Sequence, residues 1–103
     1  MNYIVEVSDR ADEDAQVIYD WIAERSPAGA LRWYEAYQAA VVRLEIDAER
    51  HPLAAESNWF PREVRQILFK TRKGLRYRIL YTISGSKVDV LHVRGPGQDL
   101  IQP

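Results

Sequence analysis

The stretch Leu75–Ile83, which reads LRYRILYTI, decides the fold because its side chains alternate in character. A period of two residues predicts a β-strand with one face turned toward a core. The first face carries Leu75, Tyr77, Ile79, Tyr81 and Ile83, and the second carries Arg76, Arg78, Leu80 and Thr82. The strand therefore has an apolar face that other elements must cover and a second face that carries two arginines.

The segments on either side of this stretch predict further strands joined by tight turns. Residues 66–72 alternate in the same way, and Lys73-Gly74 is a credible two-residue turn between the two strands. Ser84-Gly85-Ser86 turns the chain again, and Lys87–Arg94 forms the last strand. A short strand at residues 3–7, rich in β-branched and aromatic side chains, begins the chain.

Two helices are predicted between the first strand and this hairpin. Apolar residues recur at three- and four-residue steps between Asp9 and Arg25, which predicts a helix over this range. Ser8 and Asp9 are both plausible N-caps for it. Ser26-Pro27 then supplies an N-cap and a first-turn proline for a second helix that extends to about Glu49. Such a short connection predicts an antiparallel helical hairpin, and residues 51–61 form a loop.

The resulting order, β-α-α-β-β-β, predicts an α+β fold. The apolar stripes of the helical hairpin need one face of a mostly antiparallel, four-stranded sheet to pack on. A length of 103 residues fits one domain, residues 1–103. The other face of the sheet carries arginines, and we expect it to stay open unless a partner binds it.

Composition excludes several classes of function. The chain has no cysteine and two histidines, so no thiolate catalysis, structural metal or cofactor is expected. It lacks both a signal peptide and an apolar run near 18 residues, which predicts a cytoplasmic protein without membrane contact. The net charge is −1, yet residues 62–78 hold seven basic residues and one acid. The positive charge is therefore concentrated on the predicted hairpin.

The hairpin offers two interpretations. Guanidinium groups held on a rigid sheet suit phosphate or carboxylate recognition, although ordinary solvated charge on an exposed sheet face is an equal alternative. Cleavage of RNA would also need a general acid and a general base. The sequence offers few candidates for these roles, namely His92, Tyr77 or Tyr81, and Glu63.

Several stretches, taken together, resemble the RelE/ParE toxin family, whose members are often called plasmid-stabilisation proteins. They are the helix–Ser-Pro–helix junction Ile18–Pro27, Val64-Arg65, the strand Arg76–Tyr81 and the strand Val88–Arg94. They cover nearly the whole chain in the right order. The resemblance implies the toxin of a type II toxin–antitoxin system, neutralised by a cognate antitoxin in a hetero-oligomer.

The resemblance also implies candidate site residues. In ribosome-dependent members, which cleave messenger RNA, an arginine of the strand at Arg76–Tyr81 acts in catalysis, and Arg78 stands at that position. Lys70 and His92 complete the catalytic candidates for that activity. The residues expected to bind a target or antitoxin are Arg65, Arg72, Arg76, Arg78 and Arg94. Because Arg78 is expected on the sheet surface, its replacement by alanine should lower toxicity and leave the fold intact.

The sequence favours the ParE-like branch, whose members poison DNA gyrase. After Arg94 it continues Gly95-Pro96-Gly97-Gln98, where many RNA-cleaving relatives have histidine or further arginines. The hypotheses are therefore a toxin that binds a protein such as gyrase, a ribosome-dependent endoribonuclease, or an inactive member that only binds its antitoxin. An acidic antitoxin segment would complement the basic hairpin.

Overall fold

The computed structural model describes residues 2–72 and 74–96, and its elements follow the predicted order. The strands are β1 (Ile4–Val7), β2 (Arg65–Phe69), β3 (Tyr77–Ser84) and β4 (Lys87–Arg94), and the helices are α1 (Asp9–Arg25) and α2 (Pro27–Asp47). Two short 3-10 helices, Ala48–Arg50 and Ala55–Trp59, lie between α2 and β2. Lys73 of the predicted turn and the tail after residue 96 lie outside the described residues.

The two long helices begin where the sequence predicts. Ser8 Oγ accepts a hydrogen bond from the Ala11 amide at 3.1 Å, and Ser26 Oγ accepts one from the Gly29 amide at 2.9 Å. Pro27 at the start of α2 lacks an amide donor, which the first turn of a helix does not need. Ser26 thus ends α1 and caps α2, which keeps the connection between the helices short.

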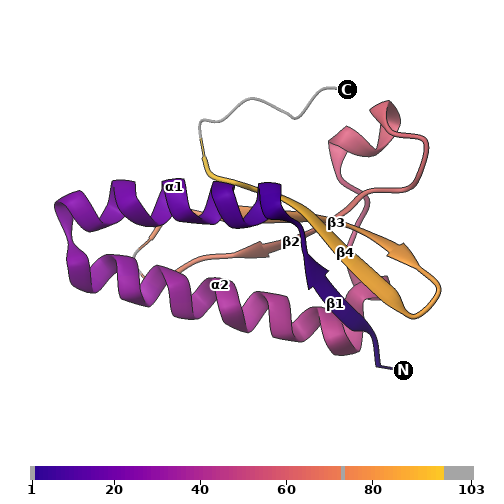
Figure 1. Cartoon of the computed structure of the whole chain (residues 1–103), viewed down its shortest axis with the longest axis horizontal. Coiled ribbons are helices and arrows are strands. Elements are labelled where there is room, and N and C mark those ends of the chain that lie inside the picture. Colours follow the sequence, from indigo (N-terminus) through magenta and orange to yellow (C-terminus); the bar gives the residue numbers. More distant parts are fainter. Residues whose placement is uncertain (1, 73, 97–103) are drawn as a thin grey trace.

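The sheet has the strand order β1-β4-β3-β2, so the first and last strands lie side by side (Figure 1). β2–β3 and β3–β4 are antiparallel pairs, whereas β1 runs parallel to β4. The predicted α+β fold with a mostly antiparallel sheet is confirmed, and the sheet is mixed at one pairing. β2 ends at Phe69, opposite Tyr77. The sequence predicted that this strand would continue to residue 72, so the strand is shorter than predicted.

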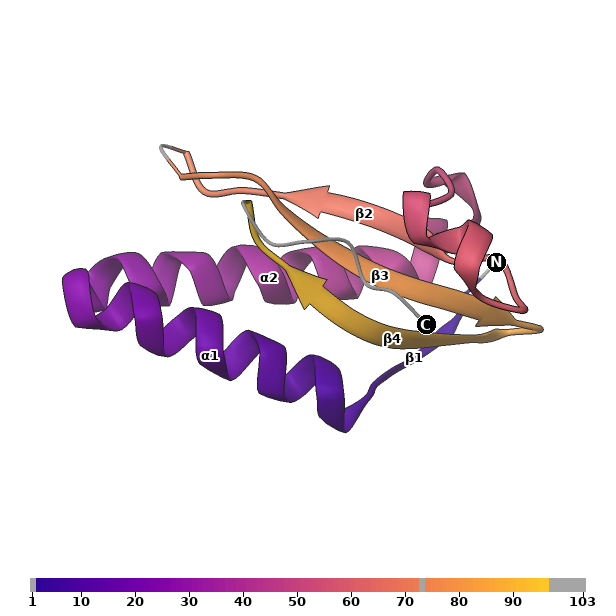
Figure 2. The same ribbon diagram turned by 90° about the horizontal axis from the view of Figure 1, so that it is seen from above.

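The helices form one layer and the sheet forms the other (Figure 2). An aromatic group fills the space between α2 and the β2–β3 hairpin. Trp33 stacks on Tyr37 at a centroid distance of 5.5 Å, and it also contacts Phe69 and Tyr77. The main core therefore lies on the helical side of the sheet. No helix in the described part of the chain is long and apolar enough to cross a membrane.

The opposite face of the sheet is not fully open, which corrects the expectation from the sequence. The segment of residues 51–64 folds over part of it and closes with a hydrogen bond from the Ala54 amide to the Val64 carbonyl at 2.8 Å. The resulting small second core consists of Ala54, Val64 and Leu80, with Phe60 and Leu91 packed against it. Apolar side chains on this face of β3 and β4 are therefore covered by the chain itself, not by a partner.

Candidate functional site

Three side chains stand in one row across the sheet. Arg78 on β3 lies opposite Leu68 on β2 and opposite Arg94 on β4. Residues directly opposite one another on neighbouring strands project to the same face. Because Ile79, the next residue of β3, is fully buried in the main core, Arg78 projects to the face away from the helices. Arg78 and Arg94, both predicted binding residues, are therefore neighbours.

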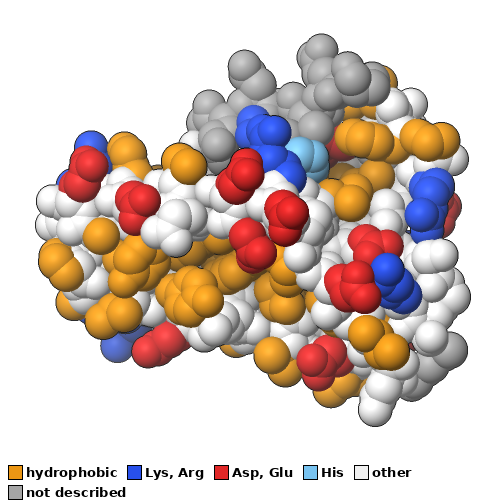
Figure 3. All heavy atoms as spheres, viewed as in Figure 1, with side chains coloured by type: hydrophobic (Ala, Val, Ile, Leu, Met, Phe, Trp, Pro, Cys, Tyr) orange, Lys and Arg blue, Asp and Glu red, His pale blue; other side chains and the backbone are white. Residues whose placement is uncertain are grey.

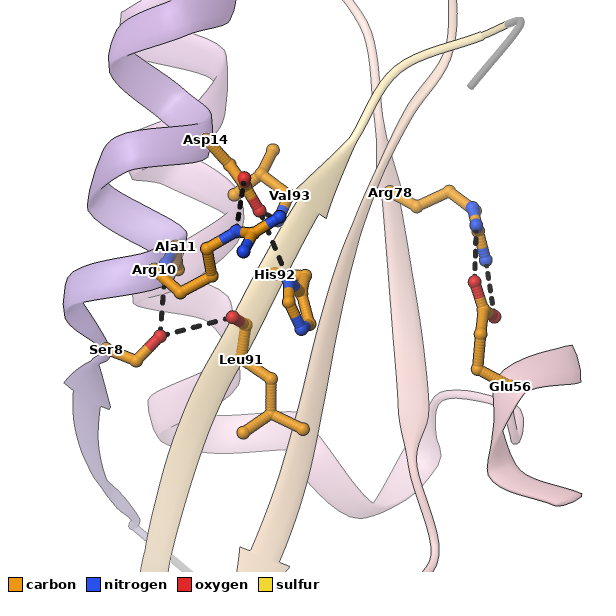
Figure 4. A network of polar contacts seen from close by, with 9 residues as sticks. All are labelled: Ser8, Arg10, Ala11, Asp14, Glu56, Arg78, Leu91, His92 and Val93. Atoms are coloured by element: carbon orange, nitrogen blue, oxygen red, sulfur yellow. Dashed lines mark hydrogen bonds and ion pairs between the residues drawn. The ribbon is translucent and has the colours of Figure 1, made fainter. Parts of the chain in front are cut away.

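Arg78 is held by a carboxylate of the protein itself. Its Nη1 and Nη2 atoms donate hydrogen bonds to Oε1 and Oε2 of Glu56 at 2.9 and 2.8 Å, and Nη1 also donates to Gln66 Oε1 at 3.0 Å. Glu56 is completely buried, whereas the Arg78 side chain keeps 21% of its exposure. Figure 4 shows the guanidinium and the carboxylate facing each other. This two-pronged geometry is the strong form of an arginine–carboxylate pair.

The Glu56–Arg78 pair changes what Arg78 can do. The end of its guanidinium that carries Nη1 and Nη2 is occupied, so a phosphate could bind at that end only if Glu56 moved away. Loss of Arg78 would leave the Glu56 charge buried without this neutralising partner. Arg78 thus anchors the segment of residues 51–64 to the sheet. The premise of the expectation that its removal leaves the fold intact is corrected, because Arg78 is paired with a buried carboxylate and is not a freely solvated side chain.

Arg65, another predicted binding residue, is also engaged within the molecule. Its Nη1 atom donates a hydrogen bond to the His51 carbonyl at 2.6 Å. Its Nη2 atom lies 3.7 Å from Glu63 Oε1, a contact at the surface. Arg65 therefore links the residue that follows the 3-10 helix Ala48–Arg50 to β2, and its guanidinium is only partly open to a partner.

His92 lies beside a bulge in β4 and close to an acid of α1. It is opposite Leu80, and the register of the two strands then shifts. The His92 Nδ1 atom lies 3.4 Å from Asp14 Oδ2, and the same oxygen accepts a hydrogen bond from the Val93 amide at 3.1 Å. Figure 4 shows Asp14 between α1 and β4, on the other side of the strands from Glu56.

The N-terminus of α1 holds the edge of β4 beyond the end of β1. The Ser8 amide donates to the Val90 carbonyl at 3.0 Å, and the Ser8 hydroxyl donates to the Leu91 carbonyl at 3.2 Å. Asp14 continues the series by accepting from Val93. These contacts satisfy backbone groups that a neighbouring strand would otherwise pair. His92 therefore lies beside a carboxylate that already accepts from the β4 backbone, and its own Nδ1 atom is buried and makes no hydrogen bond to any described residue.

Among the described residues no hydrogen bond or ion pair joins the three catalytic candidates, Lys70, Arg78 and His92, to one another. His92 is opposite Leu80, two residues after Arg78 along β3. Lys70 follows the end of β2 and lies on the other side of the row that contains Arg78. Strand geometry separates Lys70 from His92 by about 16 Å between backbones. Among residues 2–72 and 74–96, no group of three or more histidines and acids could hold a metal ion.

The remaining predicted basic residues form an exposed group at one end of the molecule. Lys70, Arg72 and Arg76 all lie between the end of β2 and the start of β3 and are exposed. We call these three residues the basic tip. Of the predicted binding residues, Arg72 and Arg76 are thus accessible, and Arg94 is half-buried beside Arg78.

Two acids that organise this region, Glu56 and Asp14, were not predicted from the sequence. Glu56 lies next to Ala54 and Ala55 in a segment predicted only as a loop, and nothing in that pattern marks it as buried. Asp14 is one of several acids near the start of α1, which is typical of any helix N-terminus. Only the tertiary packing distinguishes them from their solvated neighbours.

Comparisons with known proteins agree with this architecture of a helical hairpin on a small mixed sheet. A family model described as the ParE toxin of the type II toxin–antitoxin system parDE matches residues 5–100. The chain therefore belongs to the ParE toxin family, within the RelE/ParE group that the sequence resembles. A solved structure, a chromosomal ParDE toxin–antitoxin system from P. aeruginosa, has a similar fold, with a TM-score of 0.69 and 18% identity. The similarity covers 90% of this chain and 95% of that chain. No curated protein sequence matches.

Proposed function

We propose that this protein is a toxin that acts by binding a protein target, DNA gyrase, and that a cognate antitoxin neutralises it. Membership of the ParE toxin family supports this assignment. On this proposal the protein acts in the cytoplasm and forms a hetero-oligomer with its antitoxin. Neither binding of the target nor binding of the antitoxin requires a cofactor or a general acid–base pair.

The Glu56–Arg78 pair is the observation that favours target binding over RNA cleavage. An endoribonuclease of the RelE type needs an arginine free to stabilise phosphate charge, together with groups that move protons. Here the arginine at that position pairs with Glu56, and no hydrogen bond or ion pair between described residues joins it to Lys70 or His92. The basic tip groups three exposed cations with no acid among the described residues between β2 and β3, which suits an acidic protein surface.

An assay of gyrase supercoiling tests the proposal. Saturating purified protein should stop conversion of relaxed plasmid to supercoiled plasmid. Charge reversal at the basic tip, Arg72→Glu with Arg76→Glu, should weaken inhibition at least tenfold. Arg43→Glu with Arg50→Glu is the matched control, because both residues are exposed but lie toward the opposite end of α2. Full supercoiling at saturating wild-type protein would refute the proposal.

Two further measurements separate the alternative hypotheses. Transcript ends mapped after induction should show no codon-linked cuts, and such cuts would establish the endoribonuclease instead. Induction without the antitoxin should arrest growth. Normal growth with the folded protein present would identify an inactive member that only binds its antitoxin.

A further inference from the structure

A cleft of about 480 Å³ runs between the two helices, away from the basic tip. It is lined from α1 by Asp12, Ala15, Gln16 and Tyr19 and from α2 by Leu31, Tyr34 and Tyr37. Figure 3 shows hydrophobic side chains gathered in this hollow and acidic side chains beside it at the N-terminal part of α1. The cleft therefore combines an apolar lining with a negative rim.

Three tyrosine rings line the cleft in contact with one another. Tyr19 and Tyr34 meet edge to face, with centroids 6.1 Å apart and an interplanar angle of 85°. Tyr34 and Tyr37 are also 6.1 Å apart, at an angle of 40°. The faces of aromatic rings carry negative charge density and attract cations within about 6 Å. Rings contributed by two helices thus suit a positively charged group.

Two side chains at the cleft, Asp12 and Gln16, offer acceptor oxygens. Asp12 is exposed at the rim and supplies a carboxylate. Gln16 donates from Nε2 to Asp20 Oδ1 at 2.8 Å, which leaves its amide oxygen as an acceptor. None of the described residues that line the cleft is basic. A cationic ligand would therefore meet a carboxylate and no competing positive charge.

The charge of the helical layer favours the same ligand. Together α1 and α2 contain nine acidic residues and four basic ones. The basic tip has the opposite sign. The two surfaces therefore select partner segments of opposite charge, and a basic segment suits the helical side.

The phenol of Tyr37 forms the floor of the cleft. Tyr37 is 5% exposed, and its hydroxyl makes no hydrogen bond to any described residue. Burial, with a smaller contribution from Asp12, raises the pKa of Tyr37 to about 12, so the hydroxyl keeps its proton at neutral pH. Buried polar groups normally have a partner. A ligand that widens the cleft slightly would supply one.

We propose that this cleft binds the arginine or lysine side chain of a segment of the antitoxin. The cation lies against the rings of Tyr19 and Tyr34 and pairs with Asp12, while its aliphatic stem covers Leu31. That the segment comes from the antitoxin rests on the proposed function, whereas the chemistry of the ligand does not. An aliphatic side chain would fill the same volume but gain nothing from the carboxylate.

A nuclear magnetic resonance titration of the whole protein tests the ligand chemistry directly. The probes are N-acetyl-arginine methylamide and N-acetyl-citrulline methylamide, which have nearly the same shape but differ in charge. We expect the arginine probe to shift the ring signals of Tyr19, Tyr34 and Tyr37 and to bind at least fivefold more tightly than the citrulline probe. Asp12→Asn should abolish that preference. Glu24→Gln, which removes the same charge elsewhere on α1, should preserve it.

Equal binding of the two probes, or an unchanged preference in Asp12→Asn, would overturn the proposal. Gln16→Lys, which places a cation in the cleft, provides a second test and should remove binding of the arginine probe. The partner is tested by calorimetry with the antitoxin encoded beside the toxin gene, where Asp12→Asn should weaken binding at least tenfold. An unaffected complex would exclude the antitoxin as the source of the side chain. These titrations do not depend on gyrase inhibition, so the two proposals can fail separately.

Discussion

Arg78 reaches across 22 residues of sequence to neutralise Glu56, the one acid whose side chain is completely buried among the described residues. The strand arginine and the 3-10 helix Ala55–Trp59 are thereby joined into one unit. Gln66 on β2 accepts a further hydrogen bond from Arg78, so the contact involves two strands and the covering segment. A residue type that suits nucleic-acid chemistry here holds the second layer of the fold in place.

Replacement of Arg78 by alanine should lower the free energy of unfolding by about 3–5 kcal/mol, because it leaves the Glu56 charge buried without this partner. Urea unfolding followed by circular dichroism measures the loss. Arg76→Ala is the matched control: its side chain is exposed two residues earlier in the chain, and the change should cost at most about 0.5 kcal/mol.

A double variant separates the cost of a stranded charge from the loss of packing. Glu56→Met combined with Arg78→Met removes both charges and keeps much of the volume. It should be more stable than Arg78→Ala, because replacing a whole buried pair with apolar side chains is often nearly neutral. A loss below about 1 kcal/mol for Arg78→Ala would show that the pair does not anchor residues 51–64.

The elements predicted well are those whose signals lie within a few neighbouring residues. Ser8 and Ser26 mark the starts of both helices, and the alternation before Ser84 marks the central strand. Such signals arise from helix capping and from the periods of helix and strand, which are properties of neighbouring residues in the sequence. Sequence alternation overestimated β2 because residues 70–72 continue the pattern where the pairing to β3 has ended.

The candidate site was predicted less well because its decisive partners come from distant segments. Alternation correctly places Arg78 on the face away from the helices but carries no information about residue 56. The parallel pairing of β1 with β4 likewise has no local signal, because it joins the two ends of the described chain. Charges close in sequence thus differ in role: Arg76 is exposed and Arg78 is engaged.

Asp14 should contribute more to the free energy of unfolding than the other acids of α1, because it accepts a hydrogen bond from the Val93 amide. Val93 is fully buried, so Asp14→Ala leaves a backbone donor without its partner and should cost about 1–3 kcal/mol. Amide hydrogen exchange at Val93 should be faster in Asp14→Ala than in the wild type. Asp20→Ala is the control and should change stability by at most about 0.5 kcal/mol, because Asp20 only accepts from Gln16 at the surface. Unchanged exchange at Val93 would contradict this account of the β4 edge.

Ser26 should contribute to stability through the cap of α2. Its hydroxyl accepts from the Gly29 amide, and Ser26→Ala should cost about 1 kcal/mol of unfolding free energy. Ser26→Asp, which keeps an acceptor at the cap, should recover most of the loss. Thermal and urea unfolding of the two variants provide the comparison. Equal stability of wild type and Ser26→Ala would show that Pro27 alone fixes the start of the helix.

The raised pKa of Tyr37 predicts a loss of folding stability at high pH. Burial, and to a smaller extent Asp12, raises its pKa to about 12 in the folded protein, from 10.0 for a free tyrosine. Both states are protonated below pH 9. Above pH 10 the unfolded chain loses the proton first, so stability falls as the pH rises toward 12.

Tyr37→Phe isolates this contribution, because the Tyr37 hydroxyl has no partner among the described residues and its removal should cost little at pH 8. Linkage then gives a drop on the order of 1 kcal/mol between pH 9 and 11 for the wild type relative to Tyr37→Phe. Urea unfolding at the two pH values measures it. Parallel pH profiles for the two proteins would mean that the Tyr37 ring becomes accessible to water in the folded state, and the floor of the cleft would then already be open before any partner binds.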